Sequence, residues 1–184
     1  MMTELELRNN VVDVMRGWLG WSEANGKYRA IIDLYNTQRP LPRGYAVQYD
    51  DEWCATTVTA AGMAAGLSDI ILGECSCSRM IALYQAAGRW QESDAYRPQA
   101  GDIIMYDWQD TGAGDNTGAP DHVGIVEKVV GNIITIIEGN KGEAVARRTM
   151  AVNSRYIRGY CLPDYASKAE SEVEEIVTYD QWKA

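Results

Sequence analysis

The spacing of apolar residues divides the chain into a helical first half and a strand-rich second half. Apolar side chains recur every three or four positions over residues 9–23 and 27–38, which predicts two amphipathic helices. Two more helices are expected over 54–66 and 78–88, and the small side chains of the first would let a neighbour pack closely. From residue 101 the pattern changes to short β-branched runs between Gly, Asn and Pro, which is typical of strands.

Helices followed by strands predict an α+β fold with an antiparallel sheet of about five strands. The expected strands cover residues 101–108, 122–130, 132–139, 146–152 and 156–163. Hydrophobic residues make up 46% of the 184, which is enough for a substantial core. Residues 166–184 lose both patterns and become charged, so we interpret them as a linker or as the start of a module absent from this chain.

Charge and the N-terminal sequence limit the classes of function. A net charge of −9 argues against nucleic-acid binding, because phosphates favour basic patches, and against electrostatic capture by anionic cell walls. The chain starts without the basic segment and apolar run of a secretory signal peptide. Its apolar runs are also too short for membrane insertion. We therefore expect neither nucleic acid nor an inserted membrane segment.

The four cysteines differ in their local sequence. Cys75, Cys77 and Cys161 are expected to be small, mostly buried thiols. A single histidine and the lack of a second C-x-x-C motif do not support a structural zinc site. Cys54 instead begins a predicted helix, whose N-terminal amides favour a thiolate and can hold an oxyanion. The acidic residues before Cys54 oppose a low pKa, and on its own this residue is better read as a small buried residue in a tightly packed helix.

His122 is the one candidate base for activating Cys54. It opens a predicted strand at the rim of the sheet, and Gly124 on the same face leaves room for another element. The next predicted strand ends with Glu138 and Asn140 on one face, where a carboxylate or amide could orient the imidazole. Without such a partner, His122 would be an ordinary rim histidine.

The loop between these two strands decides whether Glu138 lies on the same face as His122. A two-residue turn would put them on opposite faces, because a one-residue slip reverses every side chain. A three-residue loop over 130–132 would instead place Glu138 opposite Gly124. The same register would place Asn140 opposite His122. We predict the three-residue loop, since an even-numbered loop without a compensating bulge would break up the site.

Four sequence blocks resemble the CHAP family, the cysteine- and histidine-dependent amidohydrolases/peptidases. The blocks WCATTVTAAG, GDIIMYDW, DHVGIVEKV and IIEGNK occur in the family's order. The resemblance extends over roughly residues 44–164. It implies a papain-like fold with the nucleophile at a helix N-terminus. Residues 44–165 would form the catalytic domain, and residues 1–43 a helical extension packed on it.

The resemblance also implies a reaction and its residues. The substrate would be bacterial peptidoglycan, cut at an amide bond of the stem peptide or cross-bridge, as in an N-acetylmuramoyl-L-alanine amidase or an endopeptidase. Cys54 would be the nucleophile, His122 the general base and then acid, and Glu138 the acid that orients the imidazole. Asn140 matches a polar fourth position, and Gln48 is the candidate side chain for the oxyanion. No cofactor is required.

Aromatic residues flank the motifs and could line a substrate groove. The candidates are Trp53, Tyr49 and Trp108, with Tyr106 beside them. Aromatic residues at the ends of strands and helices belong more often to the core, so packing is the competing interpretation.

An acidic loop precedes His122, and some CHAP relatives bind calcium through such a loop. Asp107, Asp110, Asp115 and Asp121 gather here, but their spacing does not match an EF-hand. A solvated loop at the rim of the cleft is the simpler interpretation, and calcium is the alternative.

Three functions stay open at this point. The first is a wall hydrolase of phage or prophage type, made without a signal peptide and acting after release by a holin or delivery on a virion, with a wall-binding module outside this chain. The second is another papain-like amidase, such as a γ-D-glutamyl endopeptidase of the NlpC type. The third is a non-catalytic wall-binding or virion module.

Overall fold

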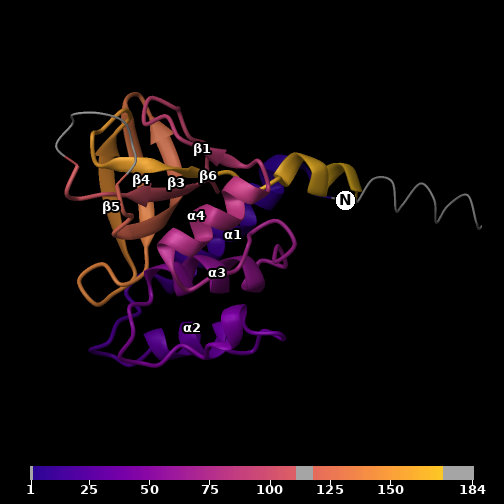
Figure 1. The fold of residues 1–184 in the computed structure, drawn as a ribbon, viewed down its shortest axis with the longest axis vertical. Helices are drawn as coiled ribbons and strands as arrows, with labels where there is room; N and C mark the ends of the chain where they lie inside the picture. Colours follow the sequence, from indigo (N-terminus) through magenta and orange to yellow (C-terminus); the bar gives the residue numbers. More distant parts are fainter. Residues whose placement is uncertain (1, 111–117, 172–184) are drawn as a thin grey trace, which may run out of the picture.

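The helices gather on one side of an antiparallel sheet, as the order of sequence patterns predicts (Figure 1). The computed structural model describes residues 2–110 and 118–171. Its helical elements are α1 (Glu4–Trp18), α2 (Tyr28–Tyr35), the short 3-10 helix η1 (Pro42–Gly44), α3 (Cys54–Ala64) and α4 (Cys77–Ala86). Its strands are β1 (Trp90–Gln91), β2 (Ile103–Tyr106), β3 (His122–Val130), β4 (Ile133–Glu138), β5 (Ala146–Ala151) and β6 (Ile157–Cys161).

The described strands form one sheet in the order β1-β6-β2-β3-β4-β5. The α+β, papain-like prediction is confirmed, with six strands in place of about five. The additional strand, β1, pairs with the end of β6. Because β1 has two residues, it is too short for an alternating pattern to reveal it.

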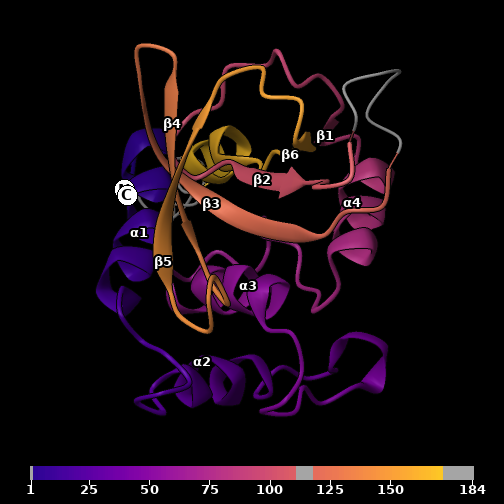
Figure 2. The same cartoon turned by 90° about the vertical axis from the view of Figure 1, so that its left-hand side faces the viewer.

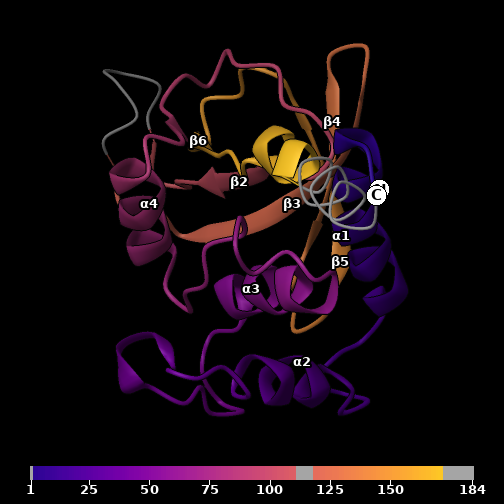
Figure 3. The same cartoon turned by 90° about the vertical axis from the view of Figure 1, so that its right-hand side faces the viewer.

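Helix α3 lies between the sheet and α2, as views from opposite sides show (Figures 2 and 3). Its first nine residues are all buried, so it has neighbours on every side. A Cβ atom added at Gly62 would lie 2.7 Å from Ile71, which is closer than real contacts allow. The small side chains thus permit the close packing that the sequence predicts, and they fix the position of the residue at the start of α3.

Helix α1 begins earlier than the apolar spacing predicts. Thr3 caps it: the Thr3 hydroxyl accepts from the Glu6 backbone N–H at 3.2 Å, and the Glu6 carboxylate accepts from the Thr3 N–H at 2.7 Å. This reciprocal capping box stabilises the first turn. The motif is present in the sequence, where the weaker apolar spacing of residues 4–8 concealed it.

The connection between β3 and β4 is a two-residue turn, so the predicted three-residue loop is wrong. Val130 pairs with Ile133 across Gly131 and Asn132, and Gly131 adopts a positive φ of 57°. Gly-Asn is a favourable pair for such a tight hairpin turn. By itself, this turn would put Glu138 and His122 on opposite faces of the sheet.

A β-bulge at Glu127 restores the register. Lys128 pairs with Thr135 while Val126 pairs with Ile136, which leaves Glu127 as an additional residue in β3. Beyond the bulge the pairing has shifted by one residue, and Ile125 lies opposite Ile137. The even-numbered turn and the bulge together therefore produce the side-chain alternation that an odd-numbered loop would have given.

The chain continues past the sheet as a helix that packs on the core. Residues 165–171 are helical, and Tyr165 is fully buried, with its hydroxyl donating to the Gly101 carbonyl at 2.8 Å. Lys168 forms an ion pair with Asp69 at 2.8 Å. The start of the segment 166–184 is thus docked on the domain. For residues 172–184, which lie outside the described part, the linker interpretation stays a prediction. Within residues 2–110 and 118–171, no helix has both the length and the apolarity to span a bilayer.

Candidate active site

Cys54 is the first residue of α3 and is 7% exposed. The capping residue Trp53 provides no side-chain acceptor, so the N–H groups of the first turn stay available for a thiolate or an oxyanion. The pKa of the Cys54 thiol lies well below its ordinary value. The neighbouring Cys77 thiol lowers this pKa most, burial opposes it, and His122 and the Ala55 backbone N–H lower it further.

His122 and Glu138 meet at the rim of the sheet. The Nε2 atom of His122 lies 3.2 Å from a carboxylate oxygen of Glu138, which has no solvent exposure. A Cβ atom at Gly124 would lie 2.8 Å from Cγ of Glu138, so the glycine provides the space for that side chain. The predicted pairing of histidine and carboxylate is therefore present, although it arises from the bulge.

The imidazole carries a proton over a wide pH range. Burial alone would lower the pKa of His122, but its interactions with Cys54 and Glu138 outweigh burial and raise the pKa to about 9. Burial likewise opposes ionisation of Glu138, yet His122 and Arg148 hold the pKa of its carboxyl below the ordinary value. The geometry favours a thiolate–imidazolium pair with an ionised carboxylate behind it.

Arg148 on β5 is a member of this constellation that the sequence did not reveal. Its Nε donates to the second carboxylate oxygen of Glu138 at 2.7 Å. Arg148 lies diagonally across the strand pair, because Glu138 is paired with Ala146. Its guanidinium also lies 4.7 Å from the centroid of the Trp108 ring. Each oxygen of the buried carboxylate thus has a cationic partner.

Cys77, expected to be an ordinary buried thiol, lies beside the candidate nucleophile. Its sulfur is 3.8 Å from that of Cys54, and Cys77 begins α4. The described cysteines are all free thiols. The spacing of 23 residues between the two cysteines gives no sign of this contact.

The pairing of Asn140 with His122 stays a prediction, because the strand pairs of β3 with β4 extend only to Ile125 and Ile137. Strand β4 ends at Glu138, and Asn140 follows in a left-handed conformation with φ 55°. Its side-chain amide donates to the Glu52 carboxylate at 2.6 Å. Asn140 therefore connects the end of β4 to the loop before Cys54.

Gln48 lies in the same loop, but its amide is engaged locally. It donates to the Ala46 carbonyl at 2.8 Å, and the Gln48 backbone N–H donates to Asp51 at 2.7 Å. The proposed contact of Gln48 with an oxyanion requires this side chain to leave Ala46, and it stays a prediction.

The three aromatic candidates for a groove have different surroundings. Trp53 is fully buried against Tyr28 and donates its indole N–H to Glu23 at 3.0 Å, so it is a core residue and not part of a groove. Tyr49 is 43% exposed. Trp108 stacks on Tyr106, with centroids 4.7 Å apart, and the Tyr106 ring lies 5.9 Å from that of His122.

Two of the acidic residues before His122 accept backbone hydrogen bonds. Asp107 accepts from the Gln109 N–H at 2.9 Å, and Asp121 accepts from the Trp108 N–H at 2.6 Å. Among residues 2–110 and 118–171, no group of three His, Cys, Asp or Glu side chains could hold a metal ion. Asp115 lies outside the described residues, and a calcium loop that includes Asp110 stays a prediction.

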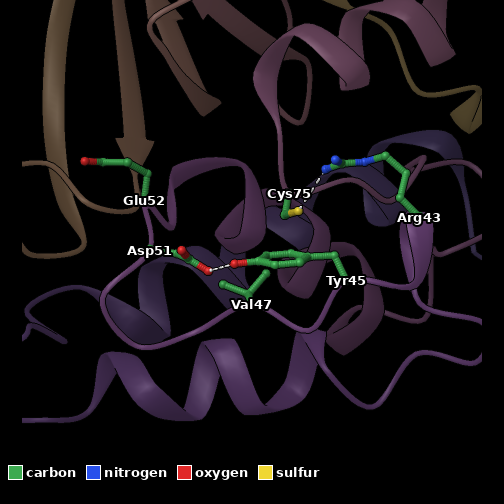
Figure 4. A pocket seen from close by; sticks show the side chains of 6 residues that line it. All are labelled: Arg43, Tyr45, Val47, Asp51, Glu52 and Cys75. Carbon is green, nitrogen blue, oxygen red and sulfur yellow. Dashed lines mark hydrogen bonds between the residues drawn. The ribbon is translucent and has the colours of Figure 1, made fainter.

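A cavity of about 380 Å³ adjoins the loops that lead into α3 and α4 (Figure 4). It is lined by Arg43, Tyr45, Val47, Asp51, Glu52 and Cys75. Within it, the Tyr45 hydroxyl donates to Asp51 at 2.6 Å, and Arg43 forms an ion pair with Glu74 at 2.8 Å. The sequence did not reveal this cavity, because its walls come from two segments far apart in the chain, residues 43–52 and the loop before α4.

Comparison with known proteins gives one family match. A family model described as "CHAP domain" matches residues 44–140, more than half of the chain, and this segment contains Cys54, His122 and Glu138. No curated protein sequence matches significantly.

Two solved structures of Ly7917 are similar to parts of the chain. "The crystal structure of Ly7917" is 33% identical with a TM-score of 0.32, over 45% of this chain and 34% of that one. "The crystal structure of Ly7917 with the hydrolyzing product of MDP" is 21% identical with a TM-score of 0.42, over 85% of this chain and 62% of that one. This chain therefore spans between about a third and three fifths of their length. Both superpositions are too loose to carry an argument.

The assignment rests on the family match and on the residues inside it. The matched segment begins in η1, includes α3, α4 and the strands β1 to β4, and ends at Asn140. The chain belongs to the CHAP domain family, the cysteine- and histidine-dependent amidohydrolases/peptidases.

Proposed function

We propose that this protein hydrolyses an amide bond in the stem peptide or cross-bridge of bacterial peptidoglycan through a cysteine acyl-enzyme. The observation that carries the proposal is the convergence of Cys54, His122 and Glu138 within the segment that matches the family. A thiol, a base and an orienting carboxylate are the parts that amide hydrolysis by covalent catalysis needs.

Acylation begins from the thiolate–imidazolium pair. The Cys54 sulfur attacks the carbonyl carbon, and the carbonyl oxygen becomes an oxyanion held by N–H groups at the start of α3. Gln48 is the candidate for a second donor. His122 then gives its proton to the nitrogen of the leaving amine, the C–N bond breaks, and a thioester remains on Cys54.

Deacylation uses the same groups in the reverse roles. Neutral His122 takes a proton from water, and the resulting hydroxide adds to the thioester carbon. The C–S bond breaks, which releases the carboxylic acid and returns the thiolate and imidazolium. Glu138 stabilises the imidazolium and holds the ring in one orientation in both halves of the reaction.

The family supports peptidoglycan as the partner. We propose a lysin of phage or prophage type that reaches the wall after release by a holin or on a virion. The negative charge of the chain gives it no electrostatic attraction to an anionic wall, so a wall-binding module outside this chain would supply targeting.

Purified sacculi from several bacterial species test this proposal. The wild-type protein is expected to release soluble fragments, whereas Cys54→Ala releases none, and Cys161→Ala serves as a control that removes a buried thiol on β6. Mass spectrometry of the new ends identifies the bond: free lactyl groups on muramic acid indicate an amidase, and cut peptides indicate an endopeptidase. Hydrolysis that survives Cys54→Ala would rule out the thiol mechanism.

A further inference from the structure

The active-site thiol has a second thiol in contact with it. Helices α3 and α4 begin at Cys54 and Cys77, and their converging N-termini bring the two sulfurs to 3.8 Å. This distance is suitable for an S–H···S hydrogen bond, in which either thiol could be the donor. A thiol is a weak donor towards neutral acceptors, but a hydrogen bond to a charged acceptor is stronger.

The surroundings decide which sulfur loses its proton. His122 interacts with Cys54, and the Ala55 N–H also lowers the pKa of the Cys54 thiol. For Cys77, its contact with Cys54, burial and nearby Cys161 all raise the pKa of the thiol. These contacts favour Cys54 as the thiolate of the pair and Cys77 as the thiol that keeps its proton.

We propose that Cys77 is a positioning residue, whose S–H donates a hydrogen bond to the Cys54 thiolate. It keeps the nucleophile ionised and fixes the direction of the Cys54 side chain. The inference rests on the proposed function, in which Cys54 is the nucleophile, but the ionisation of Cys54 can be measured without any substrate.

The bond has a different strength at each stage of the reaction. It is strong while Cys54 carries the negative charge, and it weakens when the charge moves to the oxyanion. It strengthens again when Cys54 leaves the thioester as a thiolate, and a thiol of lower pKa leaves faster. Loss of Cys77 should consequently slow deacylation and lower kcat, and where deacylation limits turnover KM falls with kcat.

The test is the pH dependence of alkylation of Cys54 by iodoacetamide, followed by peptide mass spectrometry so that each cysteine is resolved. Replacing Cys77 with alanine removes the donor and should raise the pKa of Cys54 by about one unit, since hydrogen bonds to charged groups are of that strength. At a pH below the Cys54 pKa of both the wild type and Cys77→Ala, alkylation of Cys54 should be about tenfold slower in the variant. Cys77→Ser retains a donor of similar size and should restore most of the wild-type profile.

The outcomes separate the inference from the proposed function. An unchanged pKa of Cys54 in both variants would overturn the role of Cys77 and leave the proposed function intact. A wild-type Cys54 with an ordinary thiol pKa of about 8.5 would instead contradict its assignment as the activated nucleophile. If Cys77→Ala does not fold, infrared spectra of the wild type decide. The S–H stretch assigned by Cys77→Ser should move to lower frequency when Cys54 ionises, and a stationary band would reject the bond.

Discussion

Two buried glutamates on neighbouring strands, Glu127 and Glu138, have similar surroundings and different tasks. Glu127 on β3 receives hydrogen bonds at 2.7 Å from both Arg16 and Arg147. Glu138 on β4 receives one from Arg148, also at 2.7 Å, and its other oxygen faces His122. The first carboxylate connects a helix to the sheet, whereas the second connects the sheet to a titratable base.

The difference shows that a buried ion pair indicates function only when one partner can exchange a proton. Arginine stays charged at every accessible pH, so the Glu127 cluster has a single protonation state near neutrality. His122 gains and loses its proton during the reaction, so the charge on Glu138 acts directly on the chemistry. The two sites are also linked, because Glu127 is the bulge residue that sets the register of Glu138.

The largest effect should follow from removing the charge of Glu138. In Glu138→Gln the imidazolium loses its partner, and we expect hydrolysis of sacculi to fall about 100-fold, in the range for residues that orient a catalytic ligand. Initial rates of fragment release measure this. Glu127→Gln is the matched control and should stay within about twofold of the wild type, provided that its circular dichroism shows a folded protein.

A second effect is the pH at which activity is lost on the basic side. The raised pKa of His122, about 9, means that its proton is available for the leaving amine up to that pH. The value of kcat/KM should therefore fall above pH 9 by about tenfold per pH unit. In Glu138→Gln the fall in kcat/KM on the basic side should begin at a lower pH, nearer the ordinary histidine pKa of about 6.5. If kcat/KM falls at the same pH in the variant as in the wild type, Glu138 does not act on the imidazole.

Adjacent arginines on β5 allow the comparison to be refined. Arg148→Ala leaves the buried Glu138 without a guanidinium partner, and we expect a loss of activity of about tenfold with partial recovery in Arg148→Lys. Arg147→Ala removes a guanidinium from Glu127 instead and should leave the rate unchanged. Equal losses in both variants would indicate a general effect on β5 and not a specific role of Arg148.

The sequence carries most of the fold and the chemical centre of the site. The change of apolar period near residue 101 separates helices from strands, and the motifs around Cys54 and His122 locate the candidate thiol and base. Glu138 was placed on the histidine face from strand alternation, but with a loop of the wrong length. The adjacent charges of Glu127 and Lys128 interrupt the apolar strand, and they were the available sign of a bulge.

The remaining members of the site depend on contacts that no sequence spacing encodes. Arg148 reaches Glu138 diagonally between paired strands, and Cys77 reaches Cys54 because two helix N-termini converge. For Trp53 the sequence leaves a groove and the core as alternatives, and its full burial places it in the core. Such features depend on how the elements pack together, and local patterns describe only the elements themselves.

The smallest expected effect concerns Glu127, the structural one of the two glutamates, and the stability of the fold at low pH. The hydrogen bond from Arg147 lowers the pKa of Glu127 most, burial opposes it, Arg16 lowers it further, and the result is about 2 against an ordinary 4.5. The ionised Glu127 carboxylate stabilises the fold fully at pH values above the pKa of the unfolded chain, about 4.5. This stabilisation is lost as the pH falls from about 4.5 towards 2, where the carboxyl of the folded protein takes up its proton. Both arginines are partly solvated, which limits the contribution to about 1–2 kcal/mol.

Chemical unfolding of Glu127→Gln at pH 7 should show a free energy of unfolding lower by that amount. Because the variant has no carboxyl to titrate at this position, the difference from the wild type should shrink as the pH falls below 4.5. Glu127 thus acts on the active site only through the fold. A variant that stays folded but hydrolyses sacculi much more slowly would instead show that the bulge needs this charge to hold Glu138 beside His122.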